Sequence, residues 1–356
     1  MQTTLNITLN RILTILAERQ GSDLHLVVGS RPMMRLHEEL IELSEEEVIT
    51  NDFIQGVIDI LLTEEQKQLL GSRREIIFAY DFGDRARFRV DVFYQKGFPS
   101  IVFHYIPVVV KPLSELGFPK SVEKLTQERS GLVLIGGPYR AGKTTTMVGF
   151  IESINRTQRR NILTLEQPIE HVLISNKSLI QQKEVGSDVE SWLEALEIRE
   201  EDVDVLMVTR VNSPRIMYRL LEIANSGVLV FMPLEGNSIG QLLHKIIEDC
   251  PQENREHSRY LLSKVFRGAI IQKLLPSIGG GLVLAMEIVF SSPVIAAAIK
   301  ENKLAQLSSI LLTSREQGMI SMDRYIAELV RSGQIDQSVA LQEVNDPENL
   351  KRILRS

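Results

Sequence analysis

The sequence has 356 residues, of which 44% are hydrophobic, 24% charged and 6% aromatic. This composition is typical of a soluble globular protein and excludes a disordered or fibrous class, while the length favours two domains. The net charge of −6 argues against a nucleic-acid partner, because proteins that bind the phosphate backbone concentrate Lys and Arg. Cys250 is the single cysteine, which excludes an intrachain disulfide and fits a reducing cytoplasm.

Residues 1–105 are predicted to form a small α+β domain. The pattern favours a helix over Leu5–Glu18, short strands in "DLHLVVG" and "RPMMRL", helical periodicity over residues 52–70 and an alternating strand in "ARFRVDVFYQ". The first residues do not resemble a signal peptide, and no run approaches the roughly 18 apolar residues of a membrane span. We therefore expect a chain that is neither secreted nor embedded in a membrane.

A linker is predicted over residues 106–114, where prolines interrupt regular structure. From residue 115 to 356, strands alternate with helices, which predicts a parallel sheet covered on both faces. The segment "REHSRYLLSKVFRGAIIQKLL" (255–275) is expected to be helical, and "GLVLAMEIVF" (281–290) is expected to be a strand. Further helices are predicted up to the end.

A phosphate-binding loop is predicted in "GGPYRAGKTTT", between an apolar strand and a helix. Gly137, Gly142, Lys143 and Thr144 satisfy the pattern G-x-x-x-x-G-K-[ST]. The glycines allow the backbone N–H groups to approach phosphate oxygens, Lys143 reaches the β and γ phosphates, and the Thr144 hydroxyl binds Mg²⁺. We also assign Thr145, in the first turn of the helix, to the nucleotide site. ATP or ADP with Mg²⁺ is the expected ligand.

Arg140 is unusual within this loop. It stands where a second glycine would permit a positive φ angle. A strained loop is one interpretation, and an additional bidentate phosphate donor is the other.

Several stretches together resemble the PilT/PilU retraction ATPases of type IV pili, within the secretion-superfamily ATPases. The resemblance covers nearly the whole chain in order and spacing, through "GSDLHLVVGSRPMMRL", "ARFRVDVF", the phosphate loop, "ILTLEQPIEHV", "QKEVGSD", "EDVDVLMV", "SGVLVF", "GGGLVLAMEIVF" and "SREQGMISMDRYIAELVRSGQI". It implies a PAS-like N-terminal domain, a RecA-like P-loop domain and a cytoplasmic hexamer with nucleotide between subunits. It also implies peripheral association with the inner membrane, through the platform of a pilus or secretion machine.

The sequence departs from the family pattern at positions that carry chemistry. The acidic stretch E-D-P-I-E is "EQPIE" here, so that Glu166 is retained and Gln167 replaces an aspartate. The Gly-Glu pair that ends the Walker B segment is replaced by Thr209 and Arg210. The two box histidines fall on Val228 and Glu235, two downstream arginines fall on Gly97 and His104, and the helix motif A-I-R-N-L-I is "VIAAAI" at 294–299.

Arg210 is the most serious of these departures, because an arginine cannot orient the attacking water or coordinate Mg²⁺ through it. Glu166 is the candidate for any remaining carboxylate chemistry. Arg87 and Arg89 alternate with Phe88 and are candidate arginines that act on a neighbouring subunit's nucleotide; an exposed strand face is the other interpretation.

Three functions follow from these observations. The first is a ring-forming, nucleotide-binding subunit, in a homomeric or mixed hexamer, that hydrolyses ATP weakly or not at all and regulates pilus retraction. The second is an active retraction ATPase with a remodelled site that uses Glu166 and Arg140. The third is a scaffold that does not need nucleotide, against which Lys143 and Thr144 argue.

Overall fold

The structure is a computed structural model that describes residues 2–36, 39–83, 86–197, 202–344 and 346–355. Contacts divide the chain into two compact units. The first comprises Met1–Val109 and Gln167–Val172, and the second comprises Val110–Glu166 and Leu173–Ser356. The sequence-based division assigned Gln167–Val172 to the C-terminal domain, whereas the contacts of this segment belong to the first unit.

The first unit is built on a six-stranded antiparallel sheet with the order β3-β2-β1-β6-β5-β4. Its strands are β1 (Asp23–Val27), β2 (Met33–Leu36), β3 (Glu39–Glu42), β4 (Glu75–Phe82), β5 (Ala86–Gln95) and β6 (Phe98–Ile106), and its helices are α1 (Gln2–Glu18), α2 (Asn51–Leu61) and α3 (Glu64–Arg73). Alternate residues of β5 are buried, as the sequence pattern predicted. Phe88 and Phe103 meet edge to face in the core of this unit, with ring centroids 5.9 Å apart.

The helical periodicity over residues 52–70 belongs to two helices rather than one. Helix α2 ends before Leu62, which has an extended backbone. Thr63 then caps α3 in a capping box, in which the Thr63 side chain accepts from the backbone of Gln66 and the Gln66 side chain accepts from the backbone of Thr63. Because this box satisfies free backbone N–H groups at a helix N-terminus, a new helix begins at Glu64.

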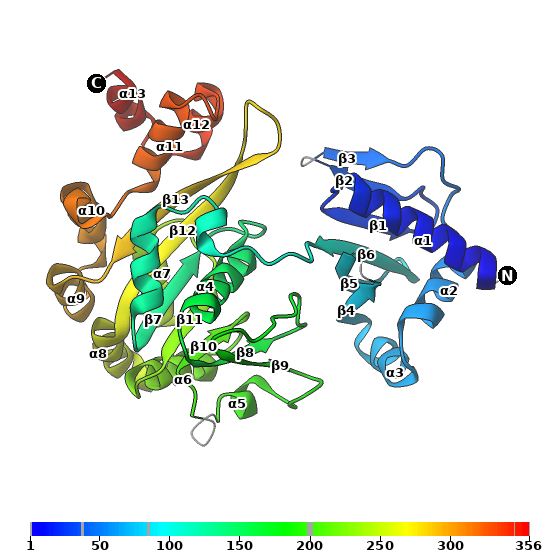
Figure 1. Ribbon diagram of the computed structural model, residues 1–356, viewed down its shortest axis with the longest axis horizontal. Helices are drawn as coiled ribbons and strands as arrows, with labels where there is room; N and C mark the ends of the chain where they lie inside the picture. The colour runs from blue at the N-terminus through cyan, green and yellow to red at the C-terminus, as the bar shows by residue number, and fades with distance from the viewer. Residues whose placement is uncertain (1, 37–38, 84–85, 198–201, 345, 356) are drawn as a thin grey trace. The chain divides into compact units, whose positions relative to one another are not determined.

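The second unit contains a seven-stranded sheet with the order β13-β12-β7-β11-β10-β8-β9. Its strands are β7 (Gly131–Gly136), β8 (Asn161–Glu166), β9 (Leu179–Glu184), β10 (Val205–Val208), β11 (Leu229–Leu234), β12 (Phe266–Pro276) and β13 (Leu282–Phe290). The pairs are parallel except for β12 and β13, which form an antiparallel hairpin at one side. Figure 1 shows this hairpin extending to the C-terminal helices.

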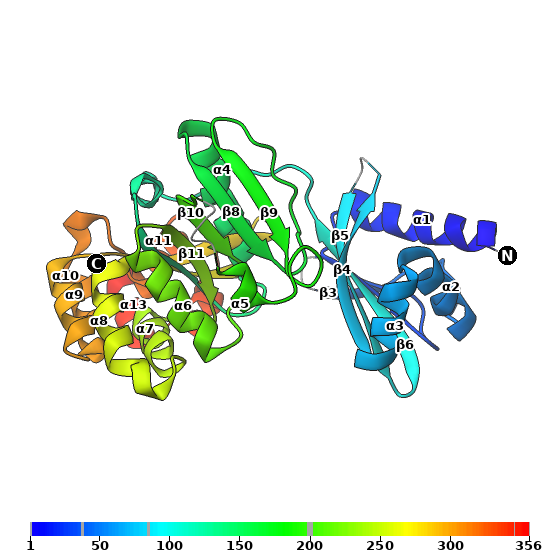
Figure 2. The ribbon, with the colours of Figure 1, turned by 90° about the horizontal axis from the view of Figure 1, so that it is seen from below.

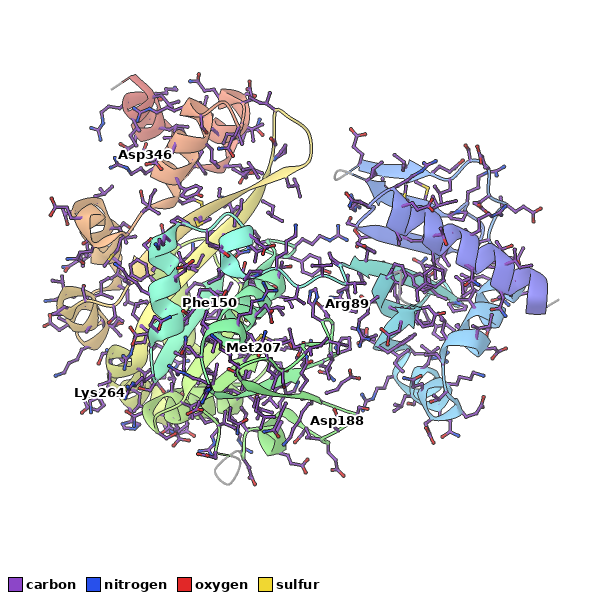
Figure 3. The ribbon with its side chains drawn as sticks, viewed as in Figure 1. Arg89, Phe150, Asp188, Met207, Lys264 and Asp346 are labelled. Carbon is purple, nitrogen blue, oxygen red and sulfur yellow. The ribbon has the colours of Figure 1, made fainter. Side chains whose placement is uncertain are left out.

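Helices cover the second sheet. They are α4 (Lys143–Thr157), α5 (Trp192–Ala195), α6 (Pro214–Asn225), α7 (Ile239–Glu248), α8 (Arg255–Val265), α9 (Pro293–Lys300), α10 (Leu307–Thr313), α11 (Met322–Arg331), α12 (Gln337–Glu343) and α13 (Pro347–Arg355), with 3-10 turns at Leu113–Glu115, Lys120–Gln127, Gln252–Asn254, Leu304–Gln306 and Arg315–Gln317. Figure 2 shows α6 to α10 gathered on one side of this unit, and α8 contacts α6, α7 and α9. Phe150 of α4 and Met207 of β10 lie inside the unit (Figure 3). The ring centroids of Phe150 and Phe231 are 5.1 Å apart.

The prediction of a helix over residues 255–275 is wrong in its second half. Helix α8 ends at Val265, and Phe266 begins β12, which pairs with β7. Residues 269–272 of this strand are all buried, so the segment lacks the alternation that would distinguish a strand from a helix. A short apolar run gives no period by itself, which is the physical reason for the error.

Glu287 of β13 ties two helices to the sheet. Its carboxylate accepts hydrogen bonds from the backbone N–H of Ile239, the first residue of α7, at 2.9 Å, and of Met322, the first residue of α11, at 3.5 Å. Burial raises the pKa of Glu287, while these two backbone bonds oppose the shift. The carboxylate thus serves the positive ends of two helices.

Candidate functional site

The candidate site lies at the carboxyl edge of the parallel strands, where β7, β11, β10 and β8 end side by side (Figure 1). Gly136 at the end of β7 pairs with Leu234 of β11, and Val208 of β10 pairs with Leu165 of β8. The phosphate loop follows β7, Glu235 follows β11, Thr209 and Arg210 follow β10, and Glu166 ends β8. Parallel sheets place their ligand sites at this edge.

The loop backbone adopts the positive φ angles that the glycine pattern predicts. Gly137 has a φ of 148° and Gly142 a φ of 81°, and a Cβ atom on Gly137 would lie 2.5 Å from the backbone oxygen of Gln272. Gly137 is therefore required both for its conformation and for its close approach to β12. Arg140 has a φ of 64°, so it occupies the left-handed region that the sequence indicated for this position. Such a conformation costs a non-glycine residue free energy.

Lys143 begins α4 and points back into the loop. Its Nζ atom donates to the carbonyl oxygens of Gly137 at 3.0 Å and Pro138 at 2.7 Å. Burial lowers the pKa of Lys143, the carboxylate of Glu235 opposes this shift, and the charge of Lys245 adds to it. The next two residues, Thr144 and Thr145, lie half-buried and exposed in the first turn of the helix. The arrangement concentrates positive charge and N–H donors at one helix end, which suits an anion.

Gln272 is a site residue that the sequence analysis missed. It is 1% exposed on β12, where its Nε2 atom donates to the carbonyl oxygen of Ala141 and its Oε1 atom accepts from the Thr146 hydroxyl at 2.9 Å. A polar residue inside the apolar run "AIIQKLL" was the available signal, because a buried amide requires partners. The assignment of this run to a helix concealed that signal.

Glu166 is fully buried at the end of β8. One carboxylate oxygen, Oε1, accepts hydrogen bonds from the Thr164 hydroxyl at 2.7 Å and from Gln182 Nε2 at 2.9 Å. The sequence analysis did not anticipate Gln182, because it lies on β9, which is adjacent to β8 only in the folded sheet. Thr164 lies two residues before Glu166 on the same strand. The two hydrogen bonds hold the carboxylate at the strand end. The catalytic role of Glu166 stays a prediction.

The end of β10 differs in character. Thr209 donates its backbone N–H to the carbonyl of Leu165 at 3.1 Å, which extends the pairing of β10 and β8 by one residue. Arg210 follows and is exposed. Glu235 at the end of β11 is also exposed, and its charge reaches Lys143, whereas Val228 lies before the start of that strand. The charge of a carboxylate at the end of β11, and not of β10, therefore acts on the phosphate-loop lysine.

Arg87 and Arg89 lie together on β5 of the first unit, as their alternation with Phe88 predicted. Arg87 donates to the carbonyl oxygen of Ile169, at 2.9 Å from Nη2, and pairs with Asp81. Arg89, labelled in Figure 3, pairs with Asp91 at 3.1 Å and with Glu170 at 3.4 Å. Both guanidinium groups are thus held by acceptors of their own chain, and their action on a neighbouring nucleotide stays a prediction.

A half-buried charge network continues from Arg89. His104 on β6, one of the positions where the family has arginine, contacts Asp23 through Nδ1 and Asp91 through Nε2, the latter at 3.2 Å. Burial lowers the pKa of His104, but the hydrogen bonds to Asp23 and Asp91 outweigh it, and the net shift is upward. Burial likewise raises the pKa of Asp91, while His104 and Arg89 lower it by more.

A pocket of about 540 Å³ lies beside the phosphate loop in the second unit. Ala141, Gly142 and Thr145 form one wall, and residues of the β12–β13 hairpin, of α11 and of the segment Leu116–Phe118 form the others. A volume of this size accommodates a small organic ligand such as a nucleoside.

The described residues also bear on metal binding and on membrane insertion. Within the described ranges, no group of three or more His, Cys, Asp or Glu side chains could hold a metal ion by itself. Among the same residues, no helix combines the length and the apolar character that crossing a membrane requires.

Known proteins resemble this chain along most of its length. A family model described as "Type II/IV secretion system protein" matches residues 111–278. The "Twitching motility protein" of Neisseria gonorrhoeae is 33% identical over 321 residues, which are 90% of this chain and 86% of that protein. The "Type IV pilus retractation ATPase PilT" of Pseudomonas aeruginosa is 32% identical over 96% of this chain and 99% of its own length.

A solved structure agrees with these relatives. The crystal structure of the pilus retraction motor PilT with bound ADP superposes with a TM-score of 0.84 at 32% identity and covers 96% of this chain and 98% of the other. The agreement confirms an α/β fold with a RecA-like ATPase core, preceded by an antiparallel-sheet domain. The chain therefore belongs to the PilT family of type IV pilus retraction ATPases, which are secretion-type P-loop ATPases.

Proposed function

We propose that this protein is a nucleotide-binding subunit of a type IV pilus or secretion machine, with weak or absent ATP hydrolysis and a regulatory role in retraction. The single observation that carries this proposal is the contrast along one sheet edge. The end of β7 carries a complete phosphate loop, whereas the end of β10 carries an exposed arginine.

Nucleotide binding rests on the loop and on the pocket beside it. The half-buried ammonium of Lys143, the glycine backbone and the N-terminus of α4 suit the phosphates of ATP or ADP. The pocket wall at Thr145 and Gly142 connects these groups to a space that suits a nucleoside. The relative that was crystallised with bound ADP supports this choice of ligand.

Thr144 is the residue that would hold Mg²⁺ brought in by the nucleotide. Its hydroxyl is one oxygen ligand, and Mg²⁺ in phosphate sites usually completes its shell with phosphate oxygens and several waters. The donor set therefore fits. Mg²⁺ held there would neutralise charge on the phosphates, and Lys143 would hold them in position.

Weak hydrolysis rests on Arg210. An arginine has only donors and a fixed charge, so that it cannot accept a proton from water or orient water through a lone pair. Its exposure allows solvent to screen the repulsion of Mg²⁺, but the missing carboxylate is not replaced from that strand. Loss of a positioned general base commonly reduces the rate by about 10²–10⁴.

The ring and the partners are also part of this proposal. The proposed assembly is a homomeric or mixed hexamer with active relatives, in the cytoplasm and attached to the inner-membrane platform of the machine. The relatives named for twitching motility and pilus retraction support a place in such a machine. Arg87 and Arg89 would reach a neighbouring nucleotide only after exchanging their present partners, Ile169 and Glu170 among them.

An active retraction ATPase is the second candidate, and Glu235 favours it. Its carboxylate acts electrostatically on Lys143, and Glu166 stands at the same sheet edge. Two carboxylates beside a phosphate loop could orient water without a Walker B glutamate.

The deciding experiment measures ADP and ATP affinity and steady-state hydrolysis on the same purified preparation, with size determined by light scattering. We expect binding, a ring alone or with an active relative, and turnover below the roughly 1 s⁻¹ of slow enzymes. Turnover at or above that rate would promote the second candidate. A preparation that binds neither nucleotide would leave only the scaffold.

A further inference from the structure

We propose that Gln272 is the positioning residue of the phosphate loop: its amide fixes the peptide between Ala141 and Gly142 so that the Gly142 N–H faces the phosphate. The inference rests on the proposed nucleotide binding and goes beyond the loop pattern, because Gln272 lies about 130 residues later in the chain, on another strand.

The register of the sheet places Gln272 beneath the loop. Strand β12 runs parallel to β7, and Ile271 pairs with Gly136, the last residue of β7. Gln272 therefore stands beside Gly137, where its backbone oxygen would lie 2.5 Å from a Cβ atom. The loop has no room to sink further toward β12, so that its height above the sheet is fixed by this backbone contact.

Hydrogen bonding determines which way the Gln272 amide faces. The carbonyl of Ala141 can only accept, so the atom facing it must be the NH₂ group. The remaining Oε1 atom accepts from the Thr146 hydroxyl at 2.9 Å. Since Thr146 is 3% exposed and Gln272 is 1% exposed, water does not compete effectively for either bond.

The peptide geometry carries this orientation to the phosphate side. In a trans peptide, the C=O and the following N–H point in opposite directions. When the Ala141 carbonyl points at Gln272, the Gly142 N–H therefore points away from β12, toward the open side of the loop. Phosphate loops bind their anion through N–H groups that point in this way.

Arg140 explains why the loop needs such an anchor. With a φ of 64°, it holds a conformation that a non-glycine residue adopts at a cost, and it directly precedes Ala141, whose carbonyl is bonded. Without the Gln272 bond, the Ala141–Gly142 peptide could rotate and Arg140 could relax. The N–H groups would then lose their common direction.

The test is ADP affinity of the full chain, measured by calorimetry for Gln272→Met, which keeps the length of the side chain and removes both bonds. We expect ADP to bind at least tenfold more weakly. The buried Ala141 carbonyl loses its donor, so that the peptide carrying the Gly142 N–H is no longer held toward the phosphate. Gln158→Met is the matched control: Gln158 Nε2 donates to the carbonyl of Thr126 at 2.8 Å at the far end of α4, about 20 Å from the loop. This variant should bind ADP as the parent does.

A second pair keeps the proposal testable if Gln272→Met does not fold. Thr146→Val removes the hydroxyl that orients the Gln272 amide, whereas Thr146→Ser retains it. We expect several-fold weaker binding for valine and parental binding for serine. A folded Gln272→Met that binds ADP within threefold of the parent, or equal binding by Thr146→Val and Thr146→Ser, would overturn the inference. A parent that does not bind ADP at all would instead refute the proposed function.

Discussion

The loop after β7 and the ends of β8 and β10 share one sheet edge but differ in what they retain. The loop keeps its glycines, Lys143 and Thr144, and it is braced by Gln272. The ends of the other strands keep Glu166, but carry Gln167 and Arg210 at the positions where the sequence analysis expects acids from the family resemblance. Under the proposed function, holding a nucleotide and breaking it depend on different strands, so that one ability can be lost without the other.

The largest expected effect concerns the phosphate loop. Lys143→Ala should weaken ADP binding by on the order of a hundredfold or more, because a half-buried cation is removed from the phosphate site. Its thermal unfolding without nucleotide should stay close to that of the parent, since the hydrogen bonds of Lys143 go only to carbonyls of the loop and burial lowers the pKa of its ammonium. Calorimetry and thermal unfolding on the same sample check both points; unchanged affinity would refute the assignment of the loop.

Glu166→Gln tests whether the carboxylate at the end of β8 supports residual ATP hydrolysis. If Glu166 carries the residual hydrolysis, turnover should fall by about a hundredfold, the lower end of the effect of a general base. ADP affinity should change little, because Thr164 and Gln182 can rearrange around an amide. Glu235→Gln is the matched variant. If it abolishes turnover while Glu166→Gln does not, Glu235 is the working carboxylate.

Introducing acids at positions 210 and 167, at the ends of β10 and β8, should increase ATP hydrolysis. Arg210→Glu, alone or with Gln167→Asp, changes the charge beside the proposed Mg²⁺ site and supplies an acceptor for water. We expect turnover to rise by about tenfold at most, because Val228 and Glu235 still replace the histidines and residues that act as a unit do not recover additively. A lower rate after both changes would contradict this explanation of weak hydrolysis.

His104, on β6 of the first unit, also departs from the family pattern, and we expect it to have a structural role there. Its raised pKa means that it stabilises the first unit below its unfolded pKa of about 6.5, and that this contribution is lost as the pH rises through the folded pKa. The lowered pKa of Asp91 contributes above the unfolded value and is lost only as the pH falls through the lowered pKa, so Asp91 does not interfere above pH 5.

Hydrogen exchange of β1 and β6, corrected for intrinsic rates, should therefore show that His104→Gln loses protection at pH 6 by about 1–3 kcal/mol. The difference from the parent should shrink at higher pH. Equal differences at pH 6 and pH 9 would exclude a role for the imidazolium.

The smallest expected effect separates the two interpretations of Arg140. Arg140→Gly and Arg140→Ala both delete the guanidinium, but only glycine relieves the left-handed backbone. We expect the glycine variant to bind ADP about fivefold more tightly than the alanine variant, a difference of about 1 kcal/mol. If both weaken binding equally relative to the parent, the guanidinium contributes to phosphate binding and strain is unimportant.

The sequence predicted those parts of the site that are local in the chain. The loop, its strand and its helix lie within "GLVLIGGPYRAGKTTT", and even the positive φ of Arg140 follows from its place among glycines. Strand β12 could not be separated from a helix, because its residues are buried on both faces. The partners of the site residues were inaccessible, because Gln272 meets Ala141, and Arg89 meets Glu170, across long separations in the chain that only the folded structure brings together.

Segment 167–172 has a practical consequence for dissecting the molecule into fragments. A fragment that ends at Val109 lacks the Ile169 carbonyl and the Glu170 carboxylate, and Arg87 and Arg89 would then lose acceptors that they have in the full chain. Binding of anions by such a fragment would reflect two newly exposed guanidinium groups rather than the behaviour of the intact protein. Work on the isolated N-terminal part should include a peptide spanning these six residues as a competitor.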